Sequence, residues 1–172
     1  MATVYLLLGT NMGDRLQHLR DAKDLLINRR DGESIPSVSK IFPVNESSIY
    51  ETAAWGKIEQ ADYLNQVIAI NTELLPQPLL KITSGIEISM GRIRKKVWEP
   101  RIIDIDILFY GNEIINEEKL IIPHPHLQNR RFVLTPLAEI APHLFHPVLK
   151  KDTLTLLKEC ADTLWVKKYS CD

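Results

Sequence analysis

The stretch "EPRIIDIDILFYG", residues 99–111, sets two aspartates inside a run that otherwise has the composition of a buried β-strand. Because side chains two residues apart on a strand project from one face, Asp104 and Asp106 are expected to point the same way. The alternate positions are apolar and are expected to point the opposite way, into a core: Ile103, Ile105, Ile107 and Phe109. An unpaired buried carboxylate costs several kcal/mol, so the pair requires either cationic partners or a chemical use.

Two interpretations of this pair compete. The Cα atoms of Asp104 and Asp106 are expected roughly 6–7 Å apart, so the carboxylates could flank two Mg²⁺ ions ~3.5–4 Å apart. Alternatively, both carboxylates lie on a solvated face or pair with Arg101 and nearby lysines. On the Asp-x-Asp motif alone, this second interpretation is the stronger one.

The residues before the aspartates favour the metal. Five cations and a tryptophan crowd this segment: Arg92, Arg94, Lys95, Lys96, Trp98 and Arg101. Cations beside a metal-binding carboxylate pair suit a polyphosphate with Mg²⁺, because that combination balances both signs of charge. A nucleic-acid patch and a solvated loop are the alternatives for this cluster, and the formal net charge of −1 counts against the nucleic acid.

The rest of the chain predicts the order β-α-β-β-α-β. Apolar runs indicate strands at 4–8, within 31–48, at 61–74 and at 101–110, and helical spacing indicates helices at 15–28 and from Pro76 to Gly91. Shorter elements follow, an extended piece at 120–126 and helices at 132–142 and 153–164. This order is the split βαβ, ferredoxin-like α+β plan, with an antiparallel sheet, two helices packed on one face and an open face carrying the site.

The composition indicates one domain, 1–172. The chain has 172 residues, of which 45% are hydrophobic and 25% charged, enough for a sizeable core. No apolar run approaches the ~20 residues of a membrane span, and "MATVYLLLG" is too short an apolar run for a signal peptide. Cys160 and Cys171 lie outside any CxxC pattern and are expected to be reduced thiols of a cytoplasmic protein.

Several motifs together resemble the 6-hydroxymethyl-7,8-dihydropterin pyrophosphokinase family of folate biosynthesis. They are, in order, "LLLGTNMGDR", "SSIYETAAWG", "DYLNQVIAINTEL", "IEISMGRIRKKVWEPRIIDIDILFYG", "LIIPHPHLQNRRFVLTPLAEIAP" and the "HP" at 146–147. The resemblance implies a ferredoxin-like transferase that moves pyrophosphate from ATP to the pterin hydroxymethyl group and releases AMP. It also implies a monomer that uses two Mg²⁺ ions and small-molecule substrates, without nucleic acid or membrane.

The resemblance assigns roles to individual residues. Asp104 and Asp106 match the magnesium-binding aspartates, and Arg92 and Arg101 match arginines that contact phosphates and assist transfer. Positions at the ATP site are matched by Glu87, Arg94, Trp98, Lys119, His124 and Arg130. Positions at the pterin site are matched by Thr52, Ala54, Trp55, Tyr63, Asn65 and Phe132.

Each proposed chemical role has an alternative in which the residue is purely structural or solvent-exposed. A pterin is flat, with a lactam and amino edge, so two rings and a carboxamide suit it. Taken alone, however, Tyr63 and Phe132 would be assigned to core packing and His124 to the surface. For Asn65, an exposed polar position and a binding role have equal weight. Two other functions also stay open: another Asp-x-Asp metal-dependent nucleotidyl or glycosyl transferase, and a non-catalytic ferredoxin-like binding module.

Overall fold

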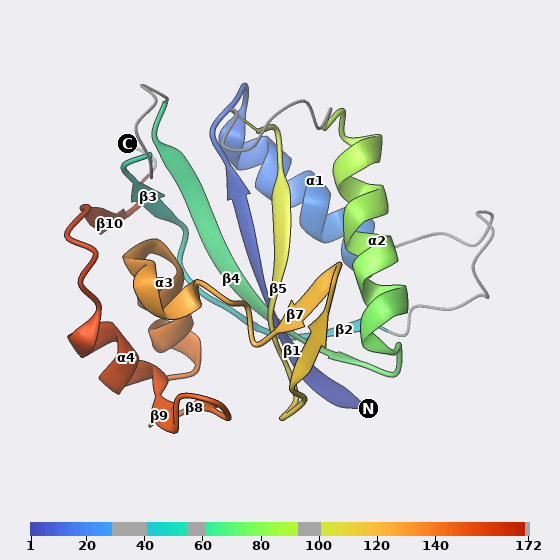
Figure 1. Cartoon of the computed structure of the whole chain (residues 1–172). Helices are drawn as coiled ribbons and strands as arrows, with labels where there is room; N and C mark the ends of the chain where they lie inside the picture. The colour runs from blue at the N-terminus through green and yellow to red at the C-terminus, as the bar shows by residue number, and fades with distance from the viewer. Residues whose placement is uncertain (29–40, 55–60, 93–100, 171–172) are drawn as a thin grey trace.

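The computed structural model, which describes residues 1–28, 41–54, 61–92 and 101–170, contains a six-stranded antiparallel sheet with helices on both faces (Figure 1). Its helices and strands, in chain order, are β1 (Ala2–Thr10), α1 (Arg15–Ile27), β2 (Ile41–Glu46), β3 (Tyr50–Thr52), β4 (Tyr63–Thr72), α2 (Pro76–Ser89), β5 (Asp104–Tyr110), β6 (Ile115–Glu117), β7 (Leu120–Ile122), α3 (Arg131–Ile140), β8 (Phe145–His146), β9 (Lys151–Asp152), α4 (Thr153–Glu159) and β10 (Val166–Lys168). No helix in these described ranges is long and apolar enough to cross a membrane.

The sheet has the predicted ferredoxin-like topology. Its order is β10-β3-β4-β1-β5, with β2 also pairing with β4. β2 lies against one half of β4, from Ile68 to Thr72, and β3 lies against the other half, from Tyr63 to Asn65. The two short strands therefore share one position in the sheet, and β1-α1-β2/β3-β4-α2-β5 forms the split βαβ unit.

Local sequence signals explain where the two helices of this unit begin and end. Asp14 caps α1 by accepting a hydrogen bond from the Gln17 N–H at 3.0 Å. Pro76 opens α2, where its missing N–H leaves no intrahelical bond unmade. Gly91 follows the last turn with φ +95°, a conformation that glycine adopts without strain. These predicted boundaries are confirmed.

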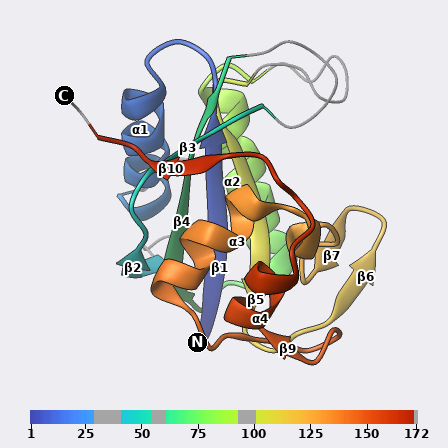
Figure 2. The same ribbon diagram turned by 90° about the vertical axis from the view of Figure 1, so that its left-hand side faces the viewer.

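Two cores lie on opposite faces of the sheet, and this modifies the expectation of an open face. The larger core joins α1 and α2 to the sheet, with Leu6, Leu19 and Leu79 fully buried. The second core packs α3 and α4 against the other face, where Leu7 and Val67 meet them. Figure 2 shows α3 lying across the sheet beside β1 and β4. The helices thus cover the part of this face that carries Leu7 and Val67, and Gly9 and Asn65 lie at the neighbouring ends of β1 and β4.

Strand β5 corrects one detail of the prediction. Ile103, Ile105 and Ile107 do face the larger core, but Leu108 and Phe109 belong to the second. The pairing with β1 slips between Tyr5 and Leu6, which leaves Leu108 as an extra residue in β5. Such a bulge reverses the alternation of side chains beyond it. Phe109 therefore points to the same face as the aspartates, contrary to the prediction.

Other predicted boundaries shift by a few residues. β1 extends from Ala2 to Thr10, beyond the predicted range of 4–8, and so includes Gly9. The helix predicted at 153–164 ends at Glu159, because the chain then turns away to form β10. β10 pairs with β3, a long-range contact that local periodicity does not reveal.

Phe109→Ala tests the second core. The Phe109 ring is 2% exposed and meets Tyr5 and His146 edge-on. We expect the substitution to lower the free energy of unfolding by about 3–5 kcal/mol, measured by urea denaturation. Phe145→Ala removes a ring that is 52% exposed and is the matched control, expected to cost under about 1 kcal/mol. Equal losses in the two variants would contradict the assignment of Phe109 to a core.

Candidate active site

One row of residues crosses the sheet at the ends of β1 and β4 that carry Gly9 and Asn65. Gly9 of β1 pairs with Asn65 of β4 on one side and with Asp104 of β5 on the other. Tyr50 of β3 pairs in turn with Asn65, and Thr52 pairs with Tyr63. Residues directly opposite one another in antiparallel strands project from the same face. The row therefore brings a carboxamide and a carboxylate to one surface, separated by a single glycine.

Asn65 is a polar side chain in a buried position. It is 2% exposed, and its Nδ2 donates a hydrogen bond to Thr52 Oγ1 at 2.8 Å. Burying an amide without hydrogen-bonding partners is unfavourable. The bond to Thr52 offsets part of this desolvation free energy and fixes the orientation of the Asn65 amide. The expectation that Asn65 would be an exposed polar residue is thereby excluded, and its carbonyl oxygen is directed toward Gly9.

Asp104, the first residue of β5, is held by two arginines. Arg92 Nη1 lies 2.6 Å from Asp104 Oδ1, and Arg101 Nη1 donates to Asp104 Oδ2. The backbone N–H of Arg101 also donates to Asn11 Oδ1 at 2.7 Å, which holds this end of the basic segment against β1. Both oxygens of the Asp104 carboxylate thus carry cationic partners, as the salt-bridge interpretation required.

Glu87 connects α2 to this cluster from behind β5. Its Oε1 accepts a hydrogen bond from the Ile105 N–H at 2.8 Å and lies 2.5 Å from Arg92 Nη1. The side chain is only 3% exposed, and burial raises the pKa of Glu87, opposed by the Ile105 hydrogen bond. These contacts let Glu87 position Arg92 and β5. Its place at the ATP site stays a prediction.

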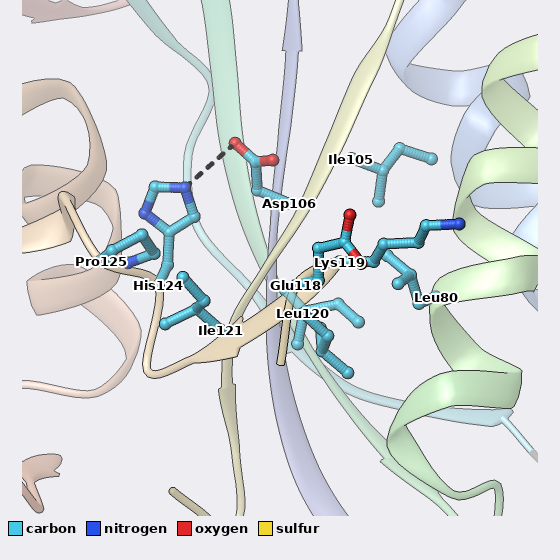
Figure 3. A pocket seen from close by; sticks show the side chains of 10 residues that line it. Leu80, Ile105, Asp106, Glu118, Lys119, Leu120, Ile121, His124 and Pro125 are labelled. Carbon is cyan, nitrogen blue, oxygen red and sulfur yellow. Dashed lines mark ion pairs between the residues drawn. The ribbon is translucent and has the colours of Figure 1, made fainter. Parts of the chain in front are cut away.

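Asp106 has a different environment, in a pocket of about 220 Å³ between β5, β7 and α2. Figure 3 shows its carboxylate facing His124, with Asp106 Oδ2 3.9 Å from His124 Nε2. Lys119, Ile121 and Leu80 line the same pocket. The structure therefore brings the predicted residues Asp106, Lys119 and His124 together.

The protonation of Asp106 and His124 follows from their surroundings. Burial raises the pKa of Asp106 to about 7, and the negative charge of Asp104 adds to the shift while Arg130 opposes it. Burial lowers the pKa of His124 to about 4, and the positive charge of Arg130 adds to that shift. His124 is therefore neutral at pH 7, and its contact with Asp106 is not an ion pair.

The remaining predicted residues fall into two groups. Thr52 and Tyr63 pair at the facing ends of β3 and β4, and Ala54 follows two residues after Thr52. Phe132 lies in the first turn of α3, with its ring centroid 5.7 Å from the Arg130 guanidinium carbon. Trp55, Arg94 and Trp98 lie outside the described residues.

Sequence analysis missed two residues of this surface, Gly9 and Asn11. Asn11 is 4% exposed, and its Nδ2 donates to the Ala61 carbonyl at 3.2 Å while its Oδ1 binds Arg101. It thus ties together the segments that lead to Tyr63 and to Asp104. Both residues belong to "GTNMGD", 9–14. Its composition is typical of a turn, so neither residue was assigned to the site. A glycine at the end of an apolar strand run was the available signal, because it often marks a close approach.

The fold and this surface define a ferredoxin-like α+β protein with a paired-carboxylate site on its sheet. The chain belongs to the 7,8-dihydro-6-hydroxymethylpterin-pyrophosphokinase family, whose model matches residues 5–142. It is similar to the 2-amino-4-hydroxy-6-hydroxymethyldihydropteridine pyrophosphokinase of Bacillus subtilis, with 45% identity over 98% of this chain and 93% of that protein. The enzyme of the same name from Aquifex aeolicus is 40% identical, over 99% of this chain and 98% of that protein.

A solved structure supports the fold. The crystal structure of Plasmodium falciparum HPPK-DHPS with SDX-DHP superposes with a TM-score of 0.69 at 18% identity, covering 92% of this chain. This chain spans 43% of that longer protein, so the likeness concerns one part of it. The predicted ferredoxin-like fold and the predicted family are thus confirmed.

The raised pKa of Asp106 predicts a pH dependence of stability. The native protein keeps this proton up to about pH 7, whereas an unfolded aspartate loses it near 3.8, so native stability falls as pH rises between them. Asp106→Asn removes this contribution. In EDTA, its melting temperature relative to the unaltered protein should therefore increase from pH 4 to pH 7.5. Asp24→Asn, which alters an exposed carboxylate on α1, is the control and should show no such trend.

Proposed function

We propose that this protein transfers the terminal diphosphate of ATP to the hydroxymethyl oxygen of 6-hydroxymethyl-7,8-dihydropterin and releases AMP. The observation that carries the proposal is the row Asn65–Gly9–Asp104. The buried carboxamide of Asn65 lies on β4, on one side of β1. The carboxylate of Asp104, which binds two arginines, lies on β5, on the other side. A flat heterocycle bearing a hydroxyl and a polyphosphate could meet between them. The names of the bacterial relatives support the same reaction.

The β3–β4 side is the proposed pterin subsite. Asn65 offers an amide to the lactam and amino edge of the heterocycle, which presents complementary donors and acceptors. Tyr63 and Phe132 are proposed to stack on its two faces, and backbone groups at Thr52, Ala54 and Trp55 to complete the edge contacts. Burial raises the pKa of Tyr63, so its ring stays neutral.

The β5 side is proposed to hold Mg²⁺ through Asp104 and Asp106. Carboxylate oxygens are the ligands that Mg²⁺ prefers, and the ion leaves its other positions to substrate phosphates and water. Within the described ranges, no group of three or more His, Cys, Asp or Glu side chains is arranged to hold a metal, which suits ions bound jointly with a nucleotide. Burial raises the pKa of Asp106, the negative charges of Asp104 and Glu87 add to the shift, and a bound cation would offset those charges. Two bound ions would polarise the phosphates and acidify the attacking hydroxyl.

Arg92 and Arg101 are proposed to exchange partners when the nucleotide binds. In the present arrangement they neutralise Asp104, and a metal at that carboxylate would release them toward the phosphate oxygens. There they offset charge that develops during transfer. Glu87 keeps Arg92 close by, through the 2.5 Å contact, so the exchange requires only a short movement.

The pocket of Asp106 is the proposed ATP subsite. Lys119 supplies positive charge, neutral His124 can donate one hydrogen bond from Nε2, and Leu80 and Ile121 offer apolar contacts to a base or ribose. Arg130 adds charge beside Asp106, and Arg94 and Trp98 are proposed to cover the nucleotide. The hydroxymethyl oxygen attacks the β-phosphorus, the bond from that phosphorus to the bridging oxygen breaks, and AMP leaves with that oxygen. The hydroxyl proton passes to water.

An assay of AMP release tests this proposal. With Mg-ATP and 6-hydroxymethyl-7,8-dihydropterin, AMP and the pterin diphosphate should form in equal amounts, and omission of either the pterin or Mg²⁺ should stop both. Turnover without the pterin would support a different metal-dependent transferase. Binding without turnover would support a non-catalytic module. Light scattering on the same sample tests the proposal that residues 1–172 act as a single monomeric domain.

Asp104→Asn and Asp106→Asn test the metal subsite. Each variant keeps the side-chain shape and removes one charge, so kcat should fall on the order of 10²–10⁴-fold. The double variant should lose little more than either single one, because the two residues act as one unit. Asp24→Asn is the matched control. If both single variants fold and retain near-normal AMP release, the two carboxylates are structural and the magnesium assignment is wrong.

Asn65→Ala tests the pterin subsite. Loss of a buried hydrogen-bonding partner should weaken pterin binding by about 1–3 kcal/mol, or roughly ten- to hundredfold, with little change in ATP binding. Isothermal titration with each ligand measures both. Asn71→Ala, at the other end of β4, removes a carboxamide that binds Thr3 and is the matched control. Unchanged pterin affinity in Asn65→Ala would remove Asn65 from the site.

A further inference from the structure

Gly9 occupies a position where a side chain would be expected. It lies inside the interior strand β1, between Leu8 and Thr10, which are both fully buried, and β1 has a partner strand on each side. Glycine in a strand interior is unfavourable because it loses more backbone entropy than other residues and packs nothing. Its backbone does not adopt the positive φ angle that favours glycine, which the structure shows only at Gly13, Gly91 and Gly111 among the described glycines. The reason for glycine here must therefore be space.

The space is taken by Asn65. A Cβ atom built on Gly9 would lie 2.9 Å from Asn65 Oδ1, closer than real Cβ contacts. Apart from its neighbours in the chain, it would meet no other atom of the described residues within 4 Å. Asn65 has a short side chain with little room to yield, because its Nδ2 is bonded to Thr52 Oγ1 at 2.8 Å and the residue is 2% exposed. Relief of the contact would require the amide to rotate, which weakens the bond to Thr52.

We infer that Gly9 is a positioning residue for the pterin. Because residue 9 has no side chain, the Asn65 amide can adopt the orientation in which it recognises the heterocycle. This inference rests on the proposed function. It assigns to Gly9 a role exerted through Asn65, with no contact of its own to the substrate. It also predicts that Gly9 affects pterin binding and leaves the nucleotide subsite on β5 unaltered.

Gly9→Ala adds the single methyl group and tests this directly. The side-chain amide resonances of Asn65, followed by ¹H–¹⁵N NMR in the ligand-free protein, should shift. The Kd for 6-hydroxymethylpterin, measured with a non-hydrolysable ATP analogue present, should rise at least about tenfold. The Kd for the ATP analogue alone should stay within about twofold. Gly85→Ala is the matched control, since a Cβ there meets no atom of the neighbouring described residues within 4 Å and the residue lies on the exposed side of α2.

The double variant Gly9→Ala/Asn65→Ala separates a positioning role from a general one. If Gly9 acts through Asn65, the alanine at position 9 should change pterin affinity by less than about twofold once Asn65 is already alanine. Equal weakening in the two backgrounds would overturn the inference. If Gly9→Ala does not fold, the double variant should fold, because the clashing carboxamide is gone. Failure of both to fold would also overturn it.

The inference and the proposed function can fail separately. Unshifted Asn65 amide resonances in Gly9→Ala would overturn the positioning role even if the unaltered protein binds the pterin. Shifted resonances in a protein that does not bind 6-hydroxymethylpterin would leave the Gly9–Asn65 contact in place. That result would overturn the assignment of the contact to pterin recognition, together with the proposed function.

Discussion

The pairing of β1 with β4 on one side and β5 on the other is the constraint on which the site depends. It sets Gly9 level with both Asn65 and Asp104, three residues that lie far apart along the chain. The pairing is well determined because alternate side chains of β1 enter two separate cores. A slip by one residue would move Leu6 and Leu8 from the core under α1 and α2 to the opposite face. Burial of apolar residues therefore specifies the geometry of the polar ones.

The face of the sheet that α3 and α4 cover has two parts, an apolar core and a polar row. α3 and α4 cover the part near Leu7, Val67 and Phe109, and the remaining part carries the polar row. The bulge at Leu108 places Phe109 on the same face as the aspartates, where its ring packs in the core with α3 and α4. One strand thus presents carboxylates at one end and a buried aromatic ring at the other, on the same face.

The two carboxylates of the site are compensated unequally in the ligand-free protein. Asp104 is compensated by Arg92 and Arg101, whereas Asp106 faces a neutral histidine and keeps a raised pKa. Like charges held near one another destabilise a ligand-free protein, and such strain is common where a cation or an anionic substrate will bind. The salt-bridge interpretation of the two aspartates and the metal interpretation are therefore compatible: arginines occupy Asp104 in one state, and metal ions are proposed to replace them in another.

The sequence by itself determined the element order, the ferredoxin-like class and the family. The element order and the fold class follow from local properties, since apolar periodicity, the Asp14 cap and Gly91 report on neighbours within one turn or one strand. The family followed from the resemblance of several motifs along the chain. It also placed Asp104 and Asp106 on one face, because the alternation of a strand is a local rule. Only the tertiary structure decided the direction of Phe109, the docking of β10 on β3, the burial of Asn65 and the role of Gly9 as its neighbour. Each of these depends on which distant strand lies alongside and in what register, and the free energy that selects the register comes from packing across the whole sheet.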